Sequence, residues 1–238
     1  MIRVRIALHE LVDGLACSDG IYAFKACYPD GIDIDWTVEE RIKLVTGPCR
    51  QYLCWAVEQG LLPLIFMRDA CLEGADLSDA DLCGSKFEGA NLKSANLLGA
   101  RLRHIDLSDA NLEGANLAYV NLLEANLAKA NLARANLKGA YLIGAALRGA
   151  NLRGANLMGA SLEHVSFALA NLEGAYLSGA YISGANFAGA DLRGTNFWRA
   201  NLARANFAGA NLEGANLEGA NLADANFAGA NLEGAKLE

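Results

Sequence analysis

Large apolar, small apolar and polar residues recur with a period of five from Ala70 to Leu237. The unit reads Ala-Asn-Leu-Glu-Gly at Ala110–Gly114 and Ala-Asn-Phe-Ala-Gly at Ala225–Gly229, and 34 consecutive units keep this register. The central residue is Leu in 27 units, Phe in six and Ile in one, and Ala stands two residues before it in 29 units. Because one polar residue separates the two apolar positions, both point to the same side of an extended chain. The pattern therefore predicts short β-strands separated by corners.

A helix explains the pattern poorly. At about 100° per residue a five-residue step turns by roughly 140°, so the apolar residues would not gather into one stripe. The frequent Gly of the fifth position would cost a helix interior about 1 kcal/mol at each occurrence. A disordered low-complexity tract is also a poor explanation, because such tracts lack regularly spaced large apolar residues.

The phenylalanines predict how many units make one coil. Phe167, Phe187, Phe207 and Phe227 recur every 20 residues, and Phe87 falls in the same class. A coil of four units stacks these rings directly above one another, about 4.8 Å apart if adjacent coils pair like strands. The prediction is an all-β, four-sided solenoid of about 8.5 coils, a rod roughly 40 Å long.

This repeat resembles that of the pentapeptide repeat family, whose pattern is Ala, Asn or Asp, Leu and two free residues. The match covers about 70 % of the chain. The resemblance implies a right-handed quadrilateral parallel β-helix, with the small residue and the central Leu or Phe inside and with Asn supporting the corners. Some departures in the Asn position keep the register: Lys86, Arg101, Tyr141, Tyr176, Tyr181 and Lys236.

The N-terminal segment differs in kind, since it holds two of the three Trp residues and all three Pro residues. Helix-start signals occur at Ser18–Asp19, at Thr37–Glu40 and at Pro48. We therefore predict a small α-helical N-terminal cap over 1–66 and the β-helix over 67–238. A cap has a clear purpose, because a solenoid end exposes unpaired strand edges and an open interior. A dedicated partner-binding domain is the alternative for this segment.

Composition and motifs give no sign of a membrane span or of catalysis. The longest apolar run, Gly60–Met67, is far too short to cross a bilayer, and no leader pattern follows Met1, so we expect a cytoplasmic bacterial protein without membrane association. None of the six Cys residues forms a C-x-x-C pair, and His104 and His164 lie three coils or roughly 14 Å apart, too far to share a metal. Nucleophile-elbow and phosphate-loop motifs are absent. The prediction is a protein that is not an enzyme and uses no cofactor or metal.

The period of 20 also allows the outward residues to be grouped by face. On the face centred at Leu72, outward residues one coil apart are mostly opposite in charge, which predicts a solvated charge ladder. The face centred at Leu77 carries apolar residues, and the face after it adds Leu123, Tyr141, Ile143 and Tyr181. A contiguous apolar patch marks a contact site, whereas isolated exposed apolar residues are ordinary, and both interpretations stay open here. The candidate protein interface consists of Leu98, Tyr119, Met158, Tyr176 and Trp198.

The resemblance also brings in proteins that bind DNA gyrase through acidic, DNA-like rods and confer quinolone resistance. Here residues 70–128 hold nine acidic and four basic residues, 129–204 hold three and eight, and 205–238 hold five and one. A duplex carries one negative charge per about 1.7 Å, so a rod with a basic middle imitates it poorly. Basic residues spread over four faces also form no stripe for binding nucleic acid.

The functional prediction is a non-enzymatic protein-interaction or scaffold module with an unknown protein partner. A DNA-mimicking gyrase-binding protein is the alternative. Because the repeats continue to Leu237, the last coil has strand edges with which a second copy could pair, and we also expect a homodimer through this C-terminal coil.

Overall fold

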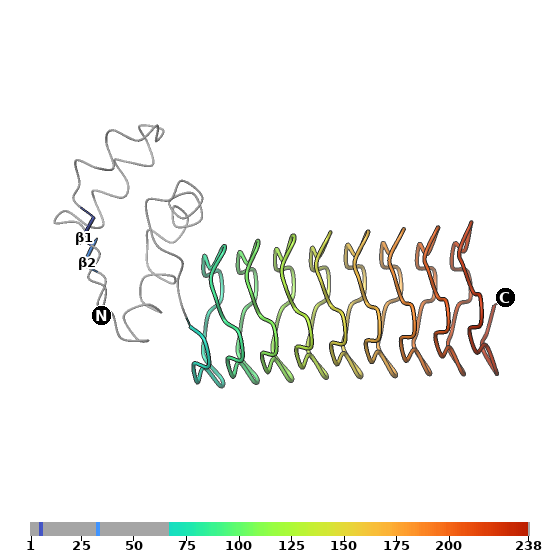
Figure 1. The fold of residues 1–238 in the computed structure, drawn as a ribbon, viewed down its shortest axis with the longest axis horizontal. Coiled ribbons are helices and arrows are strands. Elements are labelled where there is room, and N and C mark those ends of the chain that lie inside the picture. Colours follow the sequence, from blue (N-terminus) through green and yellow to red (C-terminus); the bar gives the residue numbers. More distant parts are fainter. Residues whose placement is uncertain (1–4, 7–31, 34–66, 238) are drawn as a thin grey trace, which may run out of the picture.

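A computed structural model describes residues 5–6, 32–33 and 67–237 of the chain (Figure 1). Strands β1 (Arg5–Ile6) and β2 (Ile32–Asp33) pair antiparallel, with Ile6 opposite Ile32. The sequence pattern predicted no strand at either place. The helices predicted within 1–66 lie outside the described residues.

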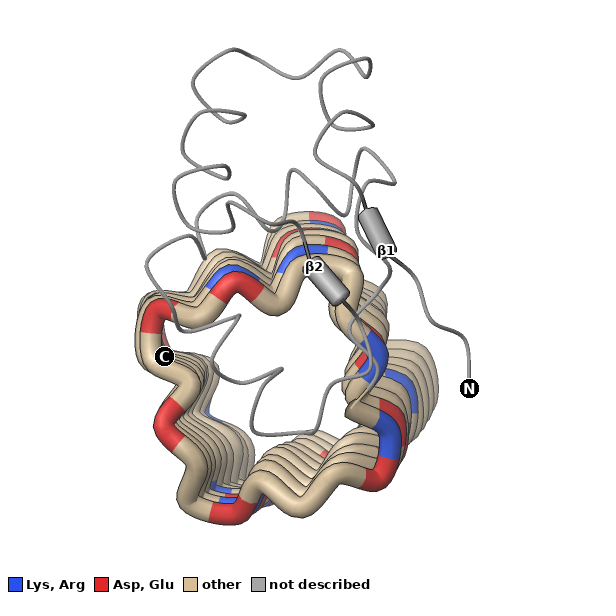
Figure 2. The backbone as a smooth tube through the Cα atoms, turned by 90° about the vertical axis from the view of Figure 1, so that its left-hand side faces the viewer, with Lys and Arg blue, Asp and Glu red and all other residues tan. Residues whose placement is uncertain are grey.

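Residues 67–237 form a solenoid in which each coil pairs with the next. Parallel bridges join residues 20 positions apart along the whole repeat, from Cys71 with Asn91 to Asn216 with Lys236. Figure 1 shows the coils stacked along one axis, and Figure 2, viewed along that axis, shows their four-sided outline. The prediction of four units per coil is confirmed, while the right-handed sense and the total of about 8.5 coils stay predictions.

Each unit contributes one short extended stretch and one tight turn. In the unit of Leu92, the Leu92 amide donates to the Asn111 carbonyl one coil on at 2.7 Å, and the Ala95 amide closes the turn on the Leu92 carbonyl at 3.0 Å. The residue two after each centre, Ser94 in this unit, has a positive φ, as the third residue of a type II turn requires. That position is Gly in 20 turns and another residue in 14, so the turn tolerates side chains at some cost in backbone strain.

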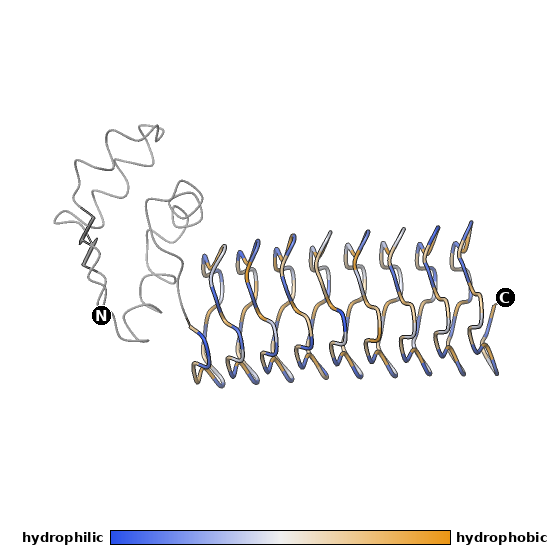
Figure 3. Cartoon of the chain, viewed as in Figure 1, coloured by the Kyte–Doolittle hydropathy of each residue, from blue (hydrophilic) through white to orange (hydrophobic). Residues whose placement is uncertain are grey.

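The interior consists of the central Leu and Phe residues and the small residue before each polar position, nearly all fully buried. Phe167, Phe187, Phe207 and Phe227 stack with ring centroids 4.9–5.0 Å apart and nearly parallel planes, as predicted. Phe197 packs edge-on against Phe187 at 5.9 Å. Figure 3 shows the resulting alternation of apolar and polar residues around every coil. These packed rows leave only the polar position and the two turn residues of each unit on the outside.

Asparagine amides form a second ladder outside the backbone. The side-chain Oδ1 of Asn111 accepts a hydrogen bond from the Glu113 amide at 3.2 Å, which supports the turn. The side-chain NH₂ of Asn111 donates to the Oδ1 of Asn91 in the preceding coil, also at 3.2 Å. The supporting role that the family resemblance implied for Asn is therefore present. Between residues 141 and 181 other residues interrupt this ladder on three faces, namely Tyr141, Ala146, Ser161, Ser166, Tyr176 and Tyr181.

The two ends of the described solenoid differ in burial. Met67 and Leu72 in the first coil are buried, whereas Leu222 and Phe227 in the last coil are half-buried and Leu237 is exposed. The homodimer through the C-terminal coil stays a prediction.

Candidate interaction surface

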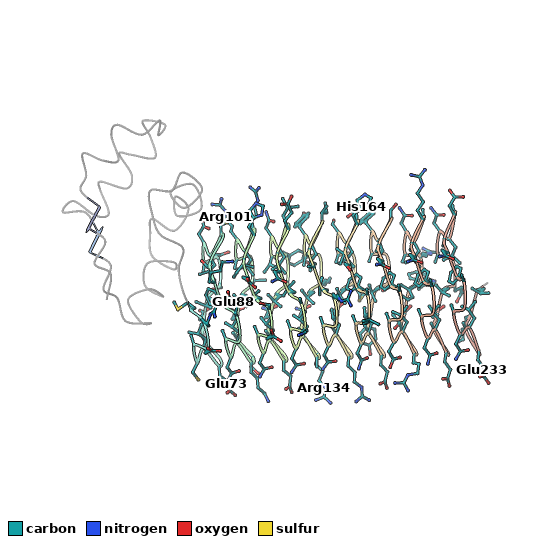
Figure 4. All side chains as sticks on the ribbon, in the orientation of Figure 1. Glu73, Glu88, Arg101, Arg134, His164 and Glu233 are labelled. Atoms are coloured by element: carbon teal, nitrogen blue, oxygen red, sulfur yellow. The ribbon has the colours of Figure 1, made fainter. Side chains whose placement is uncertain are left out.

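The four sides of the solenoid are named after their first complete unit. The first face is centred at Leu72 and every twentieth residue after it, the second at Leu77, the third at Leu82 and the fourth at Phe87. In Figure 4 labelled residues of the first face lie along one edge of the rod and labelled residues of the third face along the opposite edge. The labels on the first face are Glu73, Arg134 and Glu233, and those on the third are Arg101 and His164.

Several charges on the first face pair with one another. Glu173 lies between Arg153 and Arg193, with N–O distances of 3.2 and 3.3 Å, and Arg193 also contacts Asp191 at 2.6 Å. The hydrogen bond from the Arg193 guanidinium lowers the pKa of Asp191, and the same contact raises the pKa of Arg193. Nearer the N-terminus Lys93 pairs with Glu113 at 3.6 Å. The predicted charge ladder is present in part, because Arg134, Glu213 and Glu233 on this face form no ion pair with a described residue.

A paired carboxylate also occurs on the fourth face at Asp106. Burial raises its pKa, but hydrogen bonds from the Ser108 hydroxyl and amide, at 2.7 and 3.1 Å, and the nearby Lys86 ammonium outweigh burial and lower the pKa overall. The Asn126 side chain donates a further bond at 2.9 Å. Asp106 therefore takes the structural place of a ladder Asn and adds an ion pair to it.

All five predicted interface residues are exposed, between 38 % for Trp198 and 58 % for Tyr119. The third face adds exposed residues Tyr141, Ile143 and Tyr181, whereas Leu123 is only partly exposed.

The sequence analysis missed Leu169 on the fourth face, which is 59 % exposed. Its turn position could have indicated it, because Tyr119 and Leu169 are the only large apolar residues at the positive-φ position among the described turns.

Strand register brings four of the exposed residues around one point. The turns Met158–Gly159, Ser178–Gly179 and Trp198–Arg199 lie in successive coils of the second face, joined by Gly159 amide to Ser178 carbonyl and Gly179 amide to Trp198 carbonyl bonds of 3.1 and 2.9 Å. Tyr176 and Tyr181 stand on either side of the middle turn. Met158, Tyr176, Tyr181 and Trp198 are called the apolar cluster below.

The centre of the apolar cluster is made of small residues. A Cβ atom added to Gly179 would meet nothing within 4 Å, and the same holds for Gly159 in the preceding coil. Large side chains thus surround Ser178 and Gly179, over which a side chain from another molecule has room to lie.

Tyr119 borders the apolar cluster, whereas Leu98 lies apart from it. The Tyr119 ring lies over Gly139, where an added Cβ would be 2.7 Å from Cε1, and the Gly139 amide donates to the Met158 carbonyl at 3.0 Å. Leu98 precedes Met158 in the same outward row by three coils, with Ala118 and Lys138 in between. The structure therefore groups Met158, Tyr176 and Trp198, places Tyr119 at their border and separates Leu98.

Basic side chains near the apolar cluster have no acidic partner in the part of the chain that the structure describes. The Arg199 guanidinium carbon lies 4.3 Å from the centre of the Trp198 ring, a cation–π contact. Lys138, Arg199 and Arg204 form no ion pair with any described carboxylate, unlike Arg153 and Arg193 of the first face.

Metal ligation and membrane insertion find no support in the same residues. Among residues 67–237 and the two short strands, no group of three or more His, Cys, Asp and Glu side chains could hold a metal ion. His104 pairs with Glu124 at 3.4 Å, on the next coil. No helix long and apolar enough to cross a bilayer occurs in the described ranges.

A known protein family matches the repeat region of the chain. The sequence profile described as Pentapeptide repeats matches in eight copies, over residues 70–109, 105–142, 135–174, 160–199, 170–207 and 200–238. No curated protein sequence matches the chain.

Several solved structures are similar to the chain. HetL, a pentapeptide repeat protein involved in heterocyst differentiation regulation from the cyanobacterium Nostoc sp. strain PCC 7120, is 35 % identical over 72 % of this chain and 84 % of its own, with a TM-score of 0.43. QnrB1, a plasmid-mediated fluoroquinolone resistance protein, is 20 % identical over 66 % and 91 %, with a TM-score of 0.39. The pentapeptide repeat protein alr5209 of Nostoc PCC 7120 is 32 % identical over 44 % and 83 %, with a TM-score of 0.28. Because the profile matches span residues 70–238, more than half of its length, this chain belongs to the pentapeptide repeat family.

Proposed function

We propose that the chain is a non-enzymatic protein-interaction or scaffold module whose contact surface is centred on the apolar cluster of Met158, Tyr176, Tyr181 and Trp198. The observation that carries the proposal is the grouping of these exposed side chains on a rigid solenoid. Aromatic residues and Met are enriched at protein interfaces, and Trp and Tyr are prominent among the residues that contribute most to binding. All four occupy outward positions of the repeat, so none is part of the packed interior.

The hydrogen bonds and ion pairs of the titratable side chains support the non-enzymatic part of the proposal. Carboxylates such as Asp106 and Glu173 accept hydrogen bonds that support turns or pair with cations one coil away. A catalytic site usually needs groups converging on a place where substrate can sit, with perturbed pKa values suited to the reaction. Here the lowered pKa values of Asp106 and Asp191 have a structural explanation in Ser108 and Arg193.

DNA mimicry with gyrase as the target is the alternative, and the charges support it less. A mimic needs a continuous negative surface. Along the first face, Glu173 and Asp191 are offset by Arg153 and Arg193, and residues 129–204 carry more basic than acidic side chains.

The test is affinity capture from a lysate of the native host with the full chain as bait. The wild type is compared with Met158→Asp/Trp198→Asp and with Ala188→Asp, which adds charge to the fourth face instead. A partner retained by the wild type and by Ala188→Asp but lost by the double variant is the expected result. Circular dichroism of all three proteins confirms that the fold is unchanged.

Two other outcomes contradict the proposal. Retention of the same partner by all three baits places the contact away from the apolar cluster. Salt-sensitive inhibition of gyrase supercoiling by the wild type and the double variant alike supports the DNA-mimic alternative.

A further inference from the structure

The cations of the solenoid divide into two groups. Some are paired with a carboxylate, for example Lys86 with Asp106, Lys93 with Glu113 and Arg153 with Glu173. The second group forms no ion pair with a described carboxylate and, apart from Lys236, lies between residues 129 and 204: Lys129, Arg134, Lys138, Arg148, Arg199 and Arg204.

Three of the unpaired cations bracket the apolar cluster. Lys138 precedes Met158 by one coil in the same outward row, because the Gly139 amide bonds to the Met158 carbonyl. Arg199 follows Trp198 directly, and Arg204 occupies the next turn of the same coil. Unpaired positive charge therefore stands at both ends of the exposed apolar side chains along the rod.

Acidic residues of the described range lie near these cations but form no ion pair with them. Of the three acidic residues between 129 and 204, Glu173 and Asp191 are bound by Arg153 and Arg193 on the first face. Glu163 on the third face is the third, and Glu218 and Asp224 lie one coil beyond Arg199 and Arg204. The surface around the apolar cluster is thus apolar at its centre, with Lys138 at one end and the two arginines, followed by these two carboxylates, at the other.

We propose that the partner segment is an acidic peptide with an apolar or aromatic residue between its carboxylates, an inference that rests on the proposed function above. The apolar residue lies over Ser178 and Gly179 among the four large side chains, where it is removed from water. The carboxylates pair with Lys138 on one side and with Arg199 and Arg204 on the other. Electrostatic complementarity of this kind selects partners and speeds association.

The spacing of the cations defines the segment further. Lys138 and Arg199 are three coils apart, about 14 Å at the strand spacing. An extended peptide advances about 3.3 Å per residue, so carboxylates roughly four residues apart span the two positions. The apolar residue then falls near the middle of that span.

Nucleic acid is the competing occupant, since aromatic and basic side chains together also bind single strands. The composition here favours a peptide. A nucleic-acid site tracks the phosphate backbone with a continuous basic groove, whereas three cations at two separated positions flank Met158 and the tyrosines here.

The experiment is selection of random 12-residue displayed peptides on the full chain, with counter-selection on a Met158→Ser/Trp198→Ser variant. We expect enriched peptides with an apolar residue between acidic ones. Fluorescein-labelled copies should bind the wild type and lose at least ten-fold in affinity with Arg199→Gln/Arg204→Gln at low salt. Arg153→Gln, the same change on the first face, should alter the affinity by less than two-fold.

Other outcomes separate the two proposals. Cluster-dependent peptides that are neutral or basic overturn the acidic-partner inference and leave the proposed function standing. Failure to enrich any peptide that depends on Met158 and Trp198 overturns both. Tighter binding of a labelled 20-nucleotide single strand than of every selected peptide assigns the surface to nucleic acid and overturns the acidic-peptide inference.

Discussion

The first face and the apolar cluster are built on the same repeating backbone but have opposite surfaces. On the first face, neighbouring coils supply each other's counterions, as Glu173 does for Arg153 and Arg193. Around the apolar cluster, neighbouring coils supply large exposed side chains and cations that form no ion pair with a described carboxylate, as Trp198 and Arg199 show. Because the interior is alike on both sides, the difference lies entirely in residues that the fold does not constrain.

This difference indicates where a partner binds. A surface whose charges are already paired gains little from a further ion pair and must lose existing contacts to make one. A surface with exposed apolar area and unpaired cations gains on both counts. In a solenoid, whose turn residues are largely free to vary, such a departure from internal pairing is therefore informative about function.

The largest expected effect on stability comes from Gly→Ala substitutions in two turns near the apolar cluster. Gly139 and Gly179 both have φ near +65°, so Ala at either position costs about 1–2 kcal/mol of backbone strain. Ala at 139 must also displace the Tyr119 ring, whereas Ala at 179 meets nothing. Gly139→Ala should therefore cost about 1 kcal/mol more in the free energy of unfolding than Gly179→Ala. Urea denaturation monitored by circular dichroism measures both.

A double-mutant cycle isolates the ring contact. In a Tyr119→Ala background the two Gly→Ala changes should become equally destabilising. If they already cost the same in the wild-type background, Tyr119 does not rest on Gly139 in solution and is free to turn away from the apolar cluster.

An intermediate effect is expected from the charge ladder. Glu173→Gln leaves Arg153 and Arg193 without their shared carboxylate and should lower stability by up to about 1 kcal/mol at low salt. Added salt at about 1 M should remove most of that loss. Arg204→Gln, at a cation without an ion pair, should change the free energy of unfolding by less than about 0.5 kcal/mol. Equal losses in the two variants would remove the distinction between the two surfaces.

Much of the architecture could be predicted from the sequence because the fold repeats one local rule. Small and large residues two apart must face one way in an extended chain, and the 20-residue spacing of Phe167, Phe187 and Phe207 fixes four units per coil. The charge ladder follows from the same register. The β1–β2 pairing could not be predicted, since two-residue strands leave no periodic pattern.

The candidate surface was predicted only in part, for a physical reason. Outward residues are identified by position alone, but whether they form one patch depends on which neighbours are small. The Tyr119 ring lies over Gly139, which bonds to the Met158 carbonyl, while Lys138 and a buried Ala118 stand between Leu98 and Met158. Leu169 occupies the same turn position as Tyr119, but its row on the fourth face is otherwise Gly from Gly149 to Gly229, so the other residues of that row give no sign of an apolar side chain.

The smallest expected effect is a pH dependence of stability that arises from the paired carboxylate of Asp106. Asp106 has a pKa below its usual value in the folded protein, because hydrogen bonds from Ser108 and the charge of Lys86 outweigh its burial. The stability this carboxylate contributes is therefore present above its unfolded pKa and is lost as the pH falls through the folded pKa. Asp106→Asn keeps an oxygen for the Ser108 amide but cannot titrate, so the variant should lose less stability than the wild type between pH 6 and pH 3.

Matched thermal denaturation at the two pH values measures this difference, which hydrogen-bond energies limit to about 1 kcal/mol. Lys138→Gln serves as the comparison, because Lys138 pairs with no described carboxylate and its removal should leave the wild-type pH dependence in place. Identical acid sensitivity of Asp106→Asn and the wild type would mean that the Ser108 and Lys86 contacts do not hold the carboxylate in its charged form. The conclusion that Asp106 is held by its partners on the fourth face would then be wrong. The conclusion about the unpaired cations beside the apolar cluster would be unaffected.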